Sequence, residues 1–424
     1  MTVYARKIPN IVAEVERKRS AFRRMPDLAP PPGIFPGIPR WLLPSRLAWR
    51  QLRAEPARLL TAIAGVMFAS ILVLMQLGFR AALFETATAL PNALRGELFL
   101  IHPLTQALFR AEPLPRARAF QALAVPGVEQ VVPIYLTQLM WRNPSNGSHR
   151  AVQIIGFDTE SGAIGIDGLA GLAETLKRAD TVAFDALSRP EFGDIAGLLA
   201  RHGVVNGQLG NRAVEVIGTF KLGTTFAADG NVVTNETTFW RIAPDIQPDA
   251  MSIAAIRLKP RADPLLVRAE LRKLLPGDVD VVTRGQLIQR EHDYWDGTTP
   301  IGVIFLFGTV IGLLVGTVIV YQILFTDVTN HLREYATLKA IGFSNGYLGR
   351  VVISEAIILG VLGFVPGVLA CVLLYRLAGQ AAYLTLTLTG ERCAEVFLII
   401  VGMCVAAALL AVRKARQANP ADIF

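Results

Sequence analysis

The sequence is poor in cysteine and in charge for its length. Its three cysteines are Cys371, Cys393 and Cys404, and the long stretch 80–297 contains none, so no disulfide can hold that stretch together. Charged residues make up 18% of the 424 residues, hydrophobic residues 52%, and the mean hydropathy is +0.42. This balance excludes an ordinary soluble protein of this size and favours a membrane protein.

Sequence motifs for catalysis are also missing. The chain has no GxxxxGK[ST] phosphate loop and no HExxH pair, and its five histidines are scattered. We therefore predict no catalytic, cofactor-binding or metal-ligating residue. The first fifty residues lack the apolar core and small-residue cleavage site of a signal peptide, so we expect the first membrane span to act as an uncleaved anchor.

Four apolar runs are long enough to cross a hydrocarbon layer about 30 Å thick. They are 57–79, 300–324, 351–375 and 394–412. Four such runs would be hard to bury in a water-soluble core. The predicted fold class is thus a membrane protein with four transmembrane α-helices.

The intervening segment 80–299 is long enough for a domain of its own. Strand-like and helix-like stretches alternate at both of its ends, as in "GELFLIHP", "PRARAFQALAVPG" and "VEQVVPIYLTQLMW". We expect a large α+β domain between helices 1 and 2, joined to them by a helical stalk.

The positive charge is unevenly distributed. Residues 1–58 carry twelve Lys and Arg against four Asp and Glu, a net of +8, whereas 80–297 carry twenty-two against twenty-four, a net of −2. By the positive-inside rule the N-terminus is cytoplasmic, and four spans return the tail 413–424 to the same side. The segment 80–299 and a short loop at 376–393 are then periplasmic.

The stretch before the first span has two parts. Residues 1–40 form an extension that ends in a Pro- and Gly-rich linker. Residues 41–56 are expected to form an amphipathic helix at the membrane interface, with Leu47, Ala48 and Leu52 opposite the basic side chains. The alternative is a first helical turn that leads directly into the span.

Small residues recur within two spans. Gly308, Gly312 and Gly316 form one stripe, and Gly363 with Gly367 forms a second small-xxx-small pair. Such stripes let another helix approach closely. The sequence leaves open whether the partner is the chain's own first span or a second copy.

Glu355 is an acid inside the third apolar run. A carboxyl group at this depth needs a partner, or it reaches back to the interface. The pattern does not distinguish these two alternatives.

The connection 325–350 between the second and third spans is more elaborate than a turn requires. On a helical wheel, Arg333, Glu334 and Thr337 fall on one side, while Leu332, Tyr335 and Ala336 spread over the other. This segment is either a solvated interfacial loop or a helix that contacts a partner.

The stretch "LREYATLKAIGFS", the following "VVISEAIILGVLGFVPG" and the tail "ARQANPADIF" resemble permease subunits of the MacB/FtsX superfamily of ABC systems. The similarity is greatest to the DevC-like family. It extends over nearly the whole chain, through "SRPEFG", "IGTFKLGTTFAADGNVVTNETTF" and the second span, but not over residues 1–40.

The resemblance implies a permease that lacks its own ATPase. The segment 325–350 would be a coupling helix that contacts an ABC ATPase subunit, which binds ATP and Mg²⁺. The implied contact residues are Arg333, Glu334, Thr337, Lys339 and Gly342.

The resemblance also implies an assembly and a location. A permease homodimer in the bacterial inner membrane would act with a periplasmic membrane-fusion adaptor and, through it, with an outer-membrane TolC-like channel. The implied cargo is a lipid, a glycolipid or another amphipathic molecule. Alternatives within the superfamily are an FtsX-like regulator of a periplasmic cell-wall hydrolase and a lipoprotein-releasing permease.

Overall fold

A computed structural model describes residues 43–225, 227–340, 343–383 and 386–416. The N-terminal extension 1–40, Gly342 and the end of the tail lie outside these residues. The chain divides into two compact units. The helical unit contains residues up to 75 together with 308–374 and 388–424, and the α+β unit contains 76–307 and 375–387.

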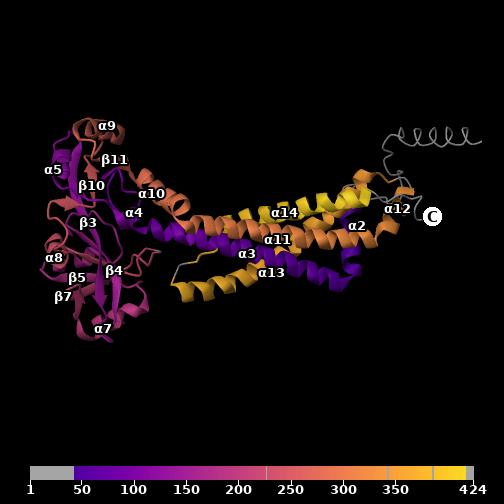
Figure 1. The fold of residues 1–424 in the computed structure, drawn as a ribbon, viewed down its shortest axis with the longest axis horizontal. Helices are drawn as coiled ribbons and strands as arrows, with labels where there is room; N and C mark the ends of the chain where they lie inside the picture. Colours follow the sequence, from indigo (N-terminus) through magenta and orange to yellow (C-terminus); the bar gives the residue numbers. More distant parts are fainter. Residues whose placement is uncertain (1–42, 226, 341–342, 384–385, 417–424) are drawn as a thin grey trace, which may run out of the picture. The chain divides into compact units, whose positions relative to one another are not determined.

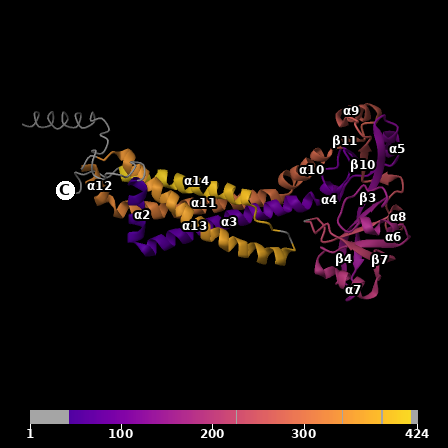
Figure 2. The same cartoon turned by 180° about the vertical axis from the view of Figure 1, so that it is seen from behind.

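Four helices are long and apolar enough to cross a membrane, as the sequence predicts. They are α3 (Pro56–Ala87), α11 (Pro300–Asn330), α13 (Asn345–Ala382) and α14 (Gly390–Arg416). Figures 1 and 2 show the parts of these helices that belong to the helical unit running alongside one another. The fold class is confirmed: four candidate transmembrane helices, with a large α+β domain between the first and the second.

Two connections differ from the expected bounds. α11 continues beyond 324 to Asn330, so the segment 325–350 comprises its last turns, the separate helix α12 (Leu332–Ala340) and the start of α13. Thr326 and Thr329 donate hydroxyl hydrogen bonds to the carbonyls four residues earlier, at 2.8 and 2.7 Å, which satisfies polar side chains without ending the helix. α13 likewise runs past 375 to Ala382, and the expected loop 376–393 is correspondingly shorter.

A separate helix precedes the first span. α2 (Leu43–Ala54) ends just before Pro56, which begins α3. Ala48 and Leu52 are buried in the helical unit, while Arg50 and Arg53 are exposed. α2 is therefore amphipathic, and its place at a membrane interface stays a prediction.

The α+β unit is built on a nine-stranded mixed sheet in the order β11-β1-β10-β3-β4-β8-β5-β7-β6. The strands are β1 (Leu98–Ile101), β3 (Val128–Arg142), β4 (His149–Phe157), β5 (Thr181–Asp185), β6 (Val205–Leu209), β7 (Arg212–Phe220), β8 (Asn231–Thr234), β10 (Ile253–Leu258) and β11 (Asp280–Thr283). The pairs β4–β8 and β5–β7 are parallel, and the other pairs are antiparallel.

The long strand β3 pairs with β4 along one edge and, at its end, with β6 along the other edge. Its residues from Ile134 onward face β4, and its last two residues, Trp141 and Arg142, also pair with Leu209 and Gln208 of β6. The run β3-β4-β8-β5-β7-β6 thereby returns to its first strand. The far end of the sheet is closed on itself.

Helices and short strands complete the α+β unit (Figure 1). They are α4 (Ala89–Ala93), η2 (Leu108–Arg110), β2 (Leu114–Pro115), α5 (Ala117–Leu123), η3 (Ala170–Leu172), α6 (Ala173–Leu176), η4 (Pro190–Phe192), α7 (Ile195–His202), α8 (Glu236–Ile242), β9 (Ala250–Met251), α9 (Pro264–Leu274), α10 (Arg284–Asp293) and the π-helical turn η5 (Tyr294–Thr298).

Side chains alternate between two apolar clusters, one on each face of the sheet. In β1, Leu98 and Leu100 belong to one cluster, and Phe99 and Ile101 belong to the other. This is the two-residue period of a strand that is buried on both faces. The covering elements include α5, α8 and α9 on the first cluster and α4, η2 and α10 on the second.

Candidate functional site

The helix α12 presents two different faces. Tyr335 and Ala336 are fully buried, whereas Arg333, Glu334 and Thr337 are exposed, as the helical wheel predicts. The Thr337 hydroxyl donates to the Arg333 carbonyl at 2.9 Å, so it is satisfied within the helix. The exposed face is thus a short polar surface whose charged side chains are available to a partner.

Lys339 lies at the edge of this surface. It is half-buried, and burial lowers the pKa of its ammonium group from the usual value. Of the predicted contact residues, the structure brings Arg333, Glu334 and Thr337 together on the exposed face and places Lys339 beside it. Gly342 lies outside the described residues.

The amphipathic helix α2 packs behind α12. Gln51 of α2 is 6% exposed, and its amide nitrogen donates to the Glu334 carboxylate at 3.3 Å. Glu334 is therefore tied to α2, while Arg333 has no hydrogen bond or ion pair from its side chain among the described residues. The sequence did not single out Gln51.

A buried polar cluster lies under α12. It contains Glu355 of α13, which is 0% exposed, Asp327 of α11, which is 7% exposed, and Tyr335 of α12. His331 lies next to Asp327, with its Nδ1 3.6 Å from a carboxylate oxygen. Glu355 is thus buried within the helical unit, and the charged group that acts on it is a second carboxyl group, that of Asp327.

The cluster holds more acceptors than donors. Neither oxygen of Glu355 has a hydrogen-bond partner with good geometry among the described residues, and the same holds for one oxygen of Asp327. Burial, and then the Glu355 and Asp327 carboxyl groups, raise the pKa of Tyr335 well above its ordinary value. The Tyr335 hydroxyl therefore keeps its proton and is a potential donor to these acids.

Asp327, His331 and Tyr335 were not predicted from the sequence. They recur every four residues, which places them on one side of a continuing helix. The sequence did contain a signal for this cluster: Asp327 follows an apolar run, and His331 and Tyr335 come four and eight residues after it.

The predicted glycine stripes contact the first membrane helix of the same chain. A methyl group on Gly316 would lie 2.6 Å from Ala69 Cβ, and one on Gly363 would lie 2.4 Å from Val66 Cβ. Gly312 and Gly367 approach Leu72 and Ser70 in the same way, at 3.3 and 2.9 Å. Gly308 is half-buried. Four glycines of α11 and α13 therefore allow these helices to pack closely on α3.

No group of three or more His, Cys, Asp or Glu side chains in the described part of the chain is placed to hold a metal ion. The chemistry that this site offers is binding: an exposed charged face on α12, fixed from behind by buried polar groups of α2, α11 and α13.

Residues 302–420 match a family model described as FtsX-like permease C-terminal. This part of the chain is therefore similar to the C-terminal region of FtsX-like permeases. The matched region contains α12, the cluster acids Asp327 and Glu355, and all five predicted packing glycines. The MacB/FtsX assignment is thereby confirmed at the level of the superfamily, and the DevC-like assignment stays a prediction.

Two solved structures are similar to parts of this chain. One is the periplasmic region of MacB from Actinobacillus actinomycetemcomitans, at 9% identity and a TM-score of 0.35, covering 48% of this chain and 95% of that one. The other is the extracellular domain of the noncanonic ABC-type transporter YknZ from Gram-positive bacteria, at 13% identity and a TM-score of 0.30, covering 44% and 99%. No curated protein matches the chain.

The family and the four apolar helices identify a membrane protein that is the transmembrane component of an ABC system.

Proposed function

We propose that this chain is the permease of an ABC exporter and that α12 is the contact for its ATPase. The observation that carries the proposal is the exposed charged face of α12, held from behind by buried polar groups of three other helices. Arg333 and Glu334 would bind a groove of the ATPase, which carries the ATP and Mg²⁺.

The buried cluster gives α12 a way to pass on motion. Tyr335 lies beside Glu355 of α13 and Asp327 of α11, and Glu334 is bonded to Gln51 of α2. Buried polar groups are costly to separate, because each loses its neighbours without gaining water. A displacement of α12 on ATP binding would therefore move α2, α11 and α13 together with it.

We further propose a homodimer in the bacterial inner membrane, with both termini in the cytoplasm and the α+β unit in the periplasm. Of the most apolar stretch of α11, 17% is buried by the rest of the chain, against 44% for α14. Leu306, Val310 and Leu314 of α11 are exposed. Such a surface is suited to lipid or to a second copy of the chain. Export of a lipid, glycolipid or other amphipathic cargo through an adaptor and a TolC-like channel follows from the resemblance of the sequence.

The sharpest test reverses one charge that has no side-chain partner among the described residues. Arg333→Glu should weaken binding of the ATPase by about tenfold, or about 1.4 kcal/mol, because an attractive contact becomes repulsive. The measurement is the affinity of the purified ATPase for the permease in lipid nanodiscs, together with export in cells. Glu334→Arg should act in the same direction.

Arg110→Glu is the matched control, because Arg110 is an exposed arginine of the α+β unit. It should bind the ATPase as the wild type does. If Arg333→Glu and Glu334→Arg also bind and export normally while they remain in the membrane, α12 is an interfacial loop and the proposal is wrong.

A further inference from the structure

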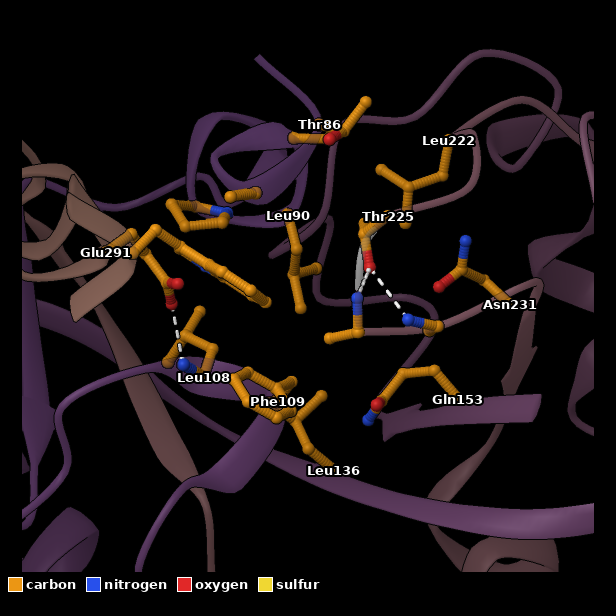
Figure 3. Close-up of a pocket in the computed structure, with 16 residues that line it drawn as sticks. Thr86, Leu90, Leu108, Phe109, Leu136, Gln153, Leu222, Thr225, Asn231 and Glu291 are labelled. Atoms are coloured by element: carbon orange, nitrogen blue, oxygen red, sulfur yellow. Dashed lines mark hydrogen bonds between the residues drawn. The ribbon is translucent and has the colours of Figure 1, made fainter. Parts of the chain in front are cut away.

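The α+β unit contains a small cavity that the proposed function does not use (Figure 3). Its volume is about 40 Å³. It lies on the side of the sheet that carries the second apolar cluster, and its walls come from the end of α3, α4, η2, β3, β4, the segment before β8, and α10 with η5. All of these belong to one compact unit.

Gln153 of β4 points its amide into this cavity (Figure 3). The residue is 5% exposed, and its backbone nitrogen donates to the Gly230 carbonyl at 3.0 Å. Neither the nitrogen nor the oxygen of the side-chain amide has a hydrogen-bond partner among the described residues. A buried amide without a partner destabilises the folded state, so its presence needs an explanation.

The other polar groups in the walls are already engaged. Asn231 donates to Asp185 at 2.9 Å and to the Gly223 carbonyl at 2.8 Å. The Glu291 carboxylate accepts from the Leu108 backbone at 2.6 Å. The remaining walls are largely apolar, with Leu90, Leu108, Phe109, Leu136 and Leu222 among them.

The chemistry of Gln153 defines what fits. A carboxamide offers two N–H donors and one carbonyl acceptor, so its full complement is a second primary carboxamide, which presents an acceptor and an N–H donor side by side. In a trans secondary amide these two groups point in opposite directions. An ester has no N–H, and it would leave the Gln153 oxygen unpaired. The apolar walls favour alkyl groups next to the amide.

We propose that this cavity binds the primary amide group of an amphipathic molecule, with the first methylenes of its alkyl chain against the leucines and Phe109. That the ligand is the exported cargo rests on the proposed function. The small volume admits only the amide group and the methylenes next to it, so the remainder of the molecule lies outside the cavity.

The position of the cavity gives binding a consequence. Thr86 belongs to α3, and Trp295 belongs to the turn that precedes α11 along the chain. An occupant therefore contacts both segments that continue into the first two membrane helices. Binding in the cavity would therefore affect α3 and α11. α11 contains three of the predicted packing glycines, and α3 is the helix that the glycines contact.

The test is a titration of the full-length permease in nanodiscs with 6-bromohexanamide, since bromine quenches tryptophan fluorescence on contact. Trp295 lines the cavity, so the part of the quenching that disappears in the Trp295→Phe variant reports binding in the cavity. We expect saturable quenching in the wild type. Gln153→Leu should weaken the amide probe about tenfold or more, because two hydrogen bonds are lost. Binding of 1-bromohexane, which has no amide, should be unchanged.

Two further variants complete the design. Leu136→Phe narrows the cavity and should weaken both probes, which keeps the test valid if Gln153→Leu does not fold. Gln121→Leu, an exposed position on α5, should bind as the wild type does. Quenching that does not saturate means that the cavity holds only water, and equal amide binding by wild type and Gln153→Leu means that the amide is not recognised; either result overturns the proposal.

The titration uses neither ATPase nor transport. A failure of the ATPase contact at Arg333 therefore leaves it unaffected, and absence of probe binding leaves the ATPase experiment unaffected.

Discussion

The two units of the molecule achieve close packing in opposite ways. In the α+β unit the interior is filled by large rings, and Trp141, Phe184 and Phe239 are almost wholly buried. In the helical unit the closest approaches are made at glycines that leave room for a neighbouring helix, at Gly316 and Gly363. Water drives large apolar side chains inward, whereas lipid gives no such drive and helices associate through close contact.

The buried acids differ in the same way. Glu291 of the α+β unit is 3% exposed and accepts a hydrogen bond from the Leu108 backbone. Glu355 of the helical unit faces a second acid and a tyrosine hydroxyl. The first carboxyl group accepts a hydrogen bond from the backbone, and the second belongs to a cluster whose members come from separate helices.

The contrast between large rings and glycines predicts opposite sensitivities. Truncating a large buried side chain should destabilise the α+β unit, and enlarging a glycine at a close helix contact should destabilise the helical unit.

The largest effect is expected from Trp141→Ala. Trp141 is 0% exposed, its indole N–H donates to the Phe192 carbonyl at 3.1 Å, and its ring centroid lies 4.9 Å from that of Phe184. Removing the ring should cost about 3–5 kcal/mol of unfolding free energy in the α+β unit. The measurement is resistance to proteolysis and heat unfolding of the purified permease.

Met140→Ala is the control for this variant, because the preceding side chain is 46% exposed. It should have little effect. Equal losses from both substitutions would contradict the description of an aromatic core.

A smaller effect is expected from pH at Glu291. Burial raises the pKa of this carboxyl from 4.5 to about 7. Between these values the folded protein holds a proton that the unfolded chain has released, so the stability from this group is greatest below pH 4.5 and falls as pH rises to about 7. The loss should reach about 3 kcal/mol at most, at about 1.4 kcal/mol per pH unit.

The Glu291→Gln variant should lack this part of the pH dependence. Heat unfolding followed by tryptophan fluorescence, at several pH values between 4.5 and 8, compares the slopes of the two proteins. Identical slopes would mean that Glu291 does not hold a proton in the folded state between pH 4.5 and about 7.

The smallest effect is expected in the helical unit, from Gly363→Ala. The new methyl group would lie 2.4 Å from Val66 Cβ, so α3 and α13 must separate slightly, at a cost of about 1–3 kcal/mol. Gly402→Ala makes the same change in α14, where no atom lies within 4 Å, and it controls for the higher helix propensity of alanine. If both variants unfold at one temperature in detergent, glycine packing does not hold these helices together.

Much of the fold could be predicted because it depends on local patterns. The four apolar runs lie within α3, α11, α13 and α14, and the stretches expected as strand, helix and strand are β1, α5 and β3. The ends of helices were less predictable. The second span was predicted to end at 324, but α11 continues to Asn330, and Thr326 and Thr329 donate to backbone carbonyls of this same helix.

The sites were predictable only where one helix contains them. The exposed and buried faces of α12 follow from its own periodicity. Gln51 and Glu334 are 283 residues apart, and Glu291 meets Leu108 across 183 residues. A single sequence gives no sign of such pairings. Gln153 is one polar residue among apolar neighbours in β4, and only the assembled sheet shows that its amide is buried.

The closure of β3 onto β6 has a consequence for how the protein avoids aggregation. Because that end of the sheet is paired, β11 is the edge of the nine-stranded sheet that remains open among the described strands, and it is four residues long. Its carbonyl at Val281 accepts a hydrogen bond from the Arg268 guanidinium of α9 at 2.8 Å. A short edge whose acceptor is occupied by a charged side chain is a poor template for a strand of another molecule. The domain therefore has a safeguard against edge-to-edge pairing with other copies that does not depend on a disulfide, which its sequence cannot form.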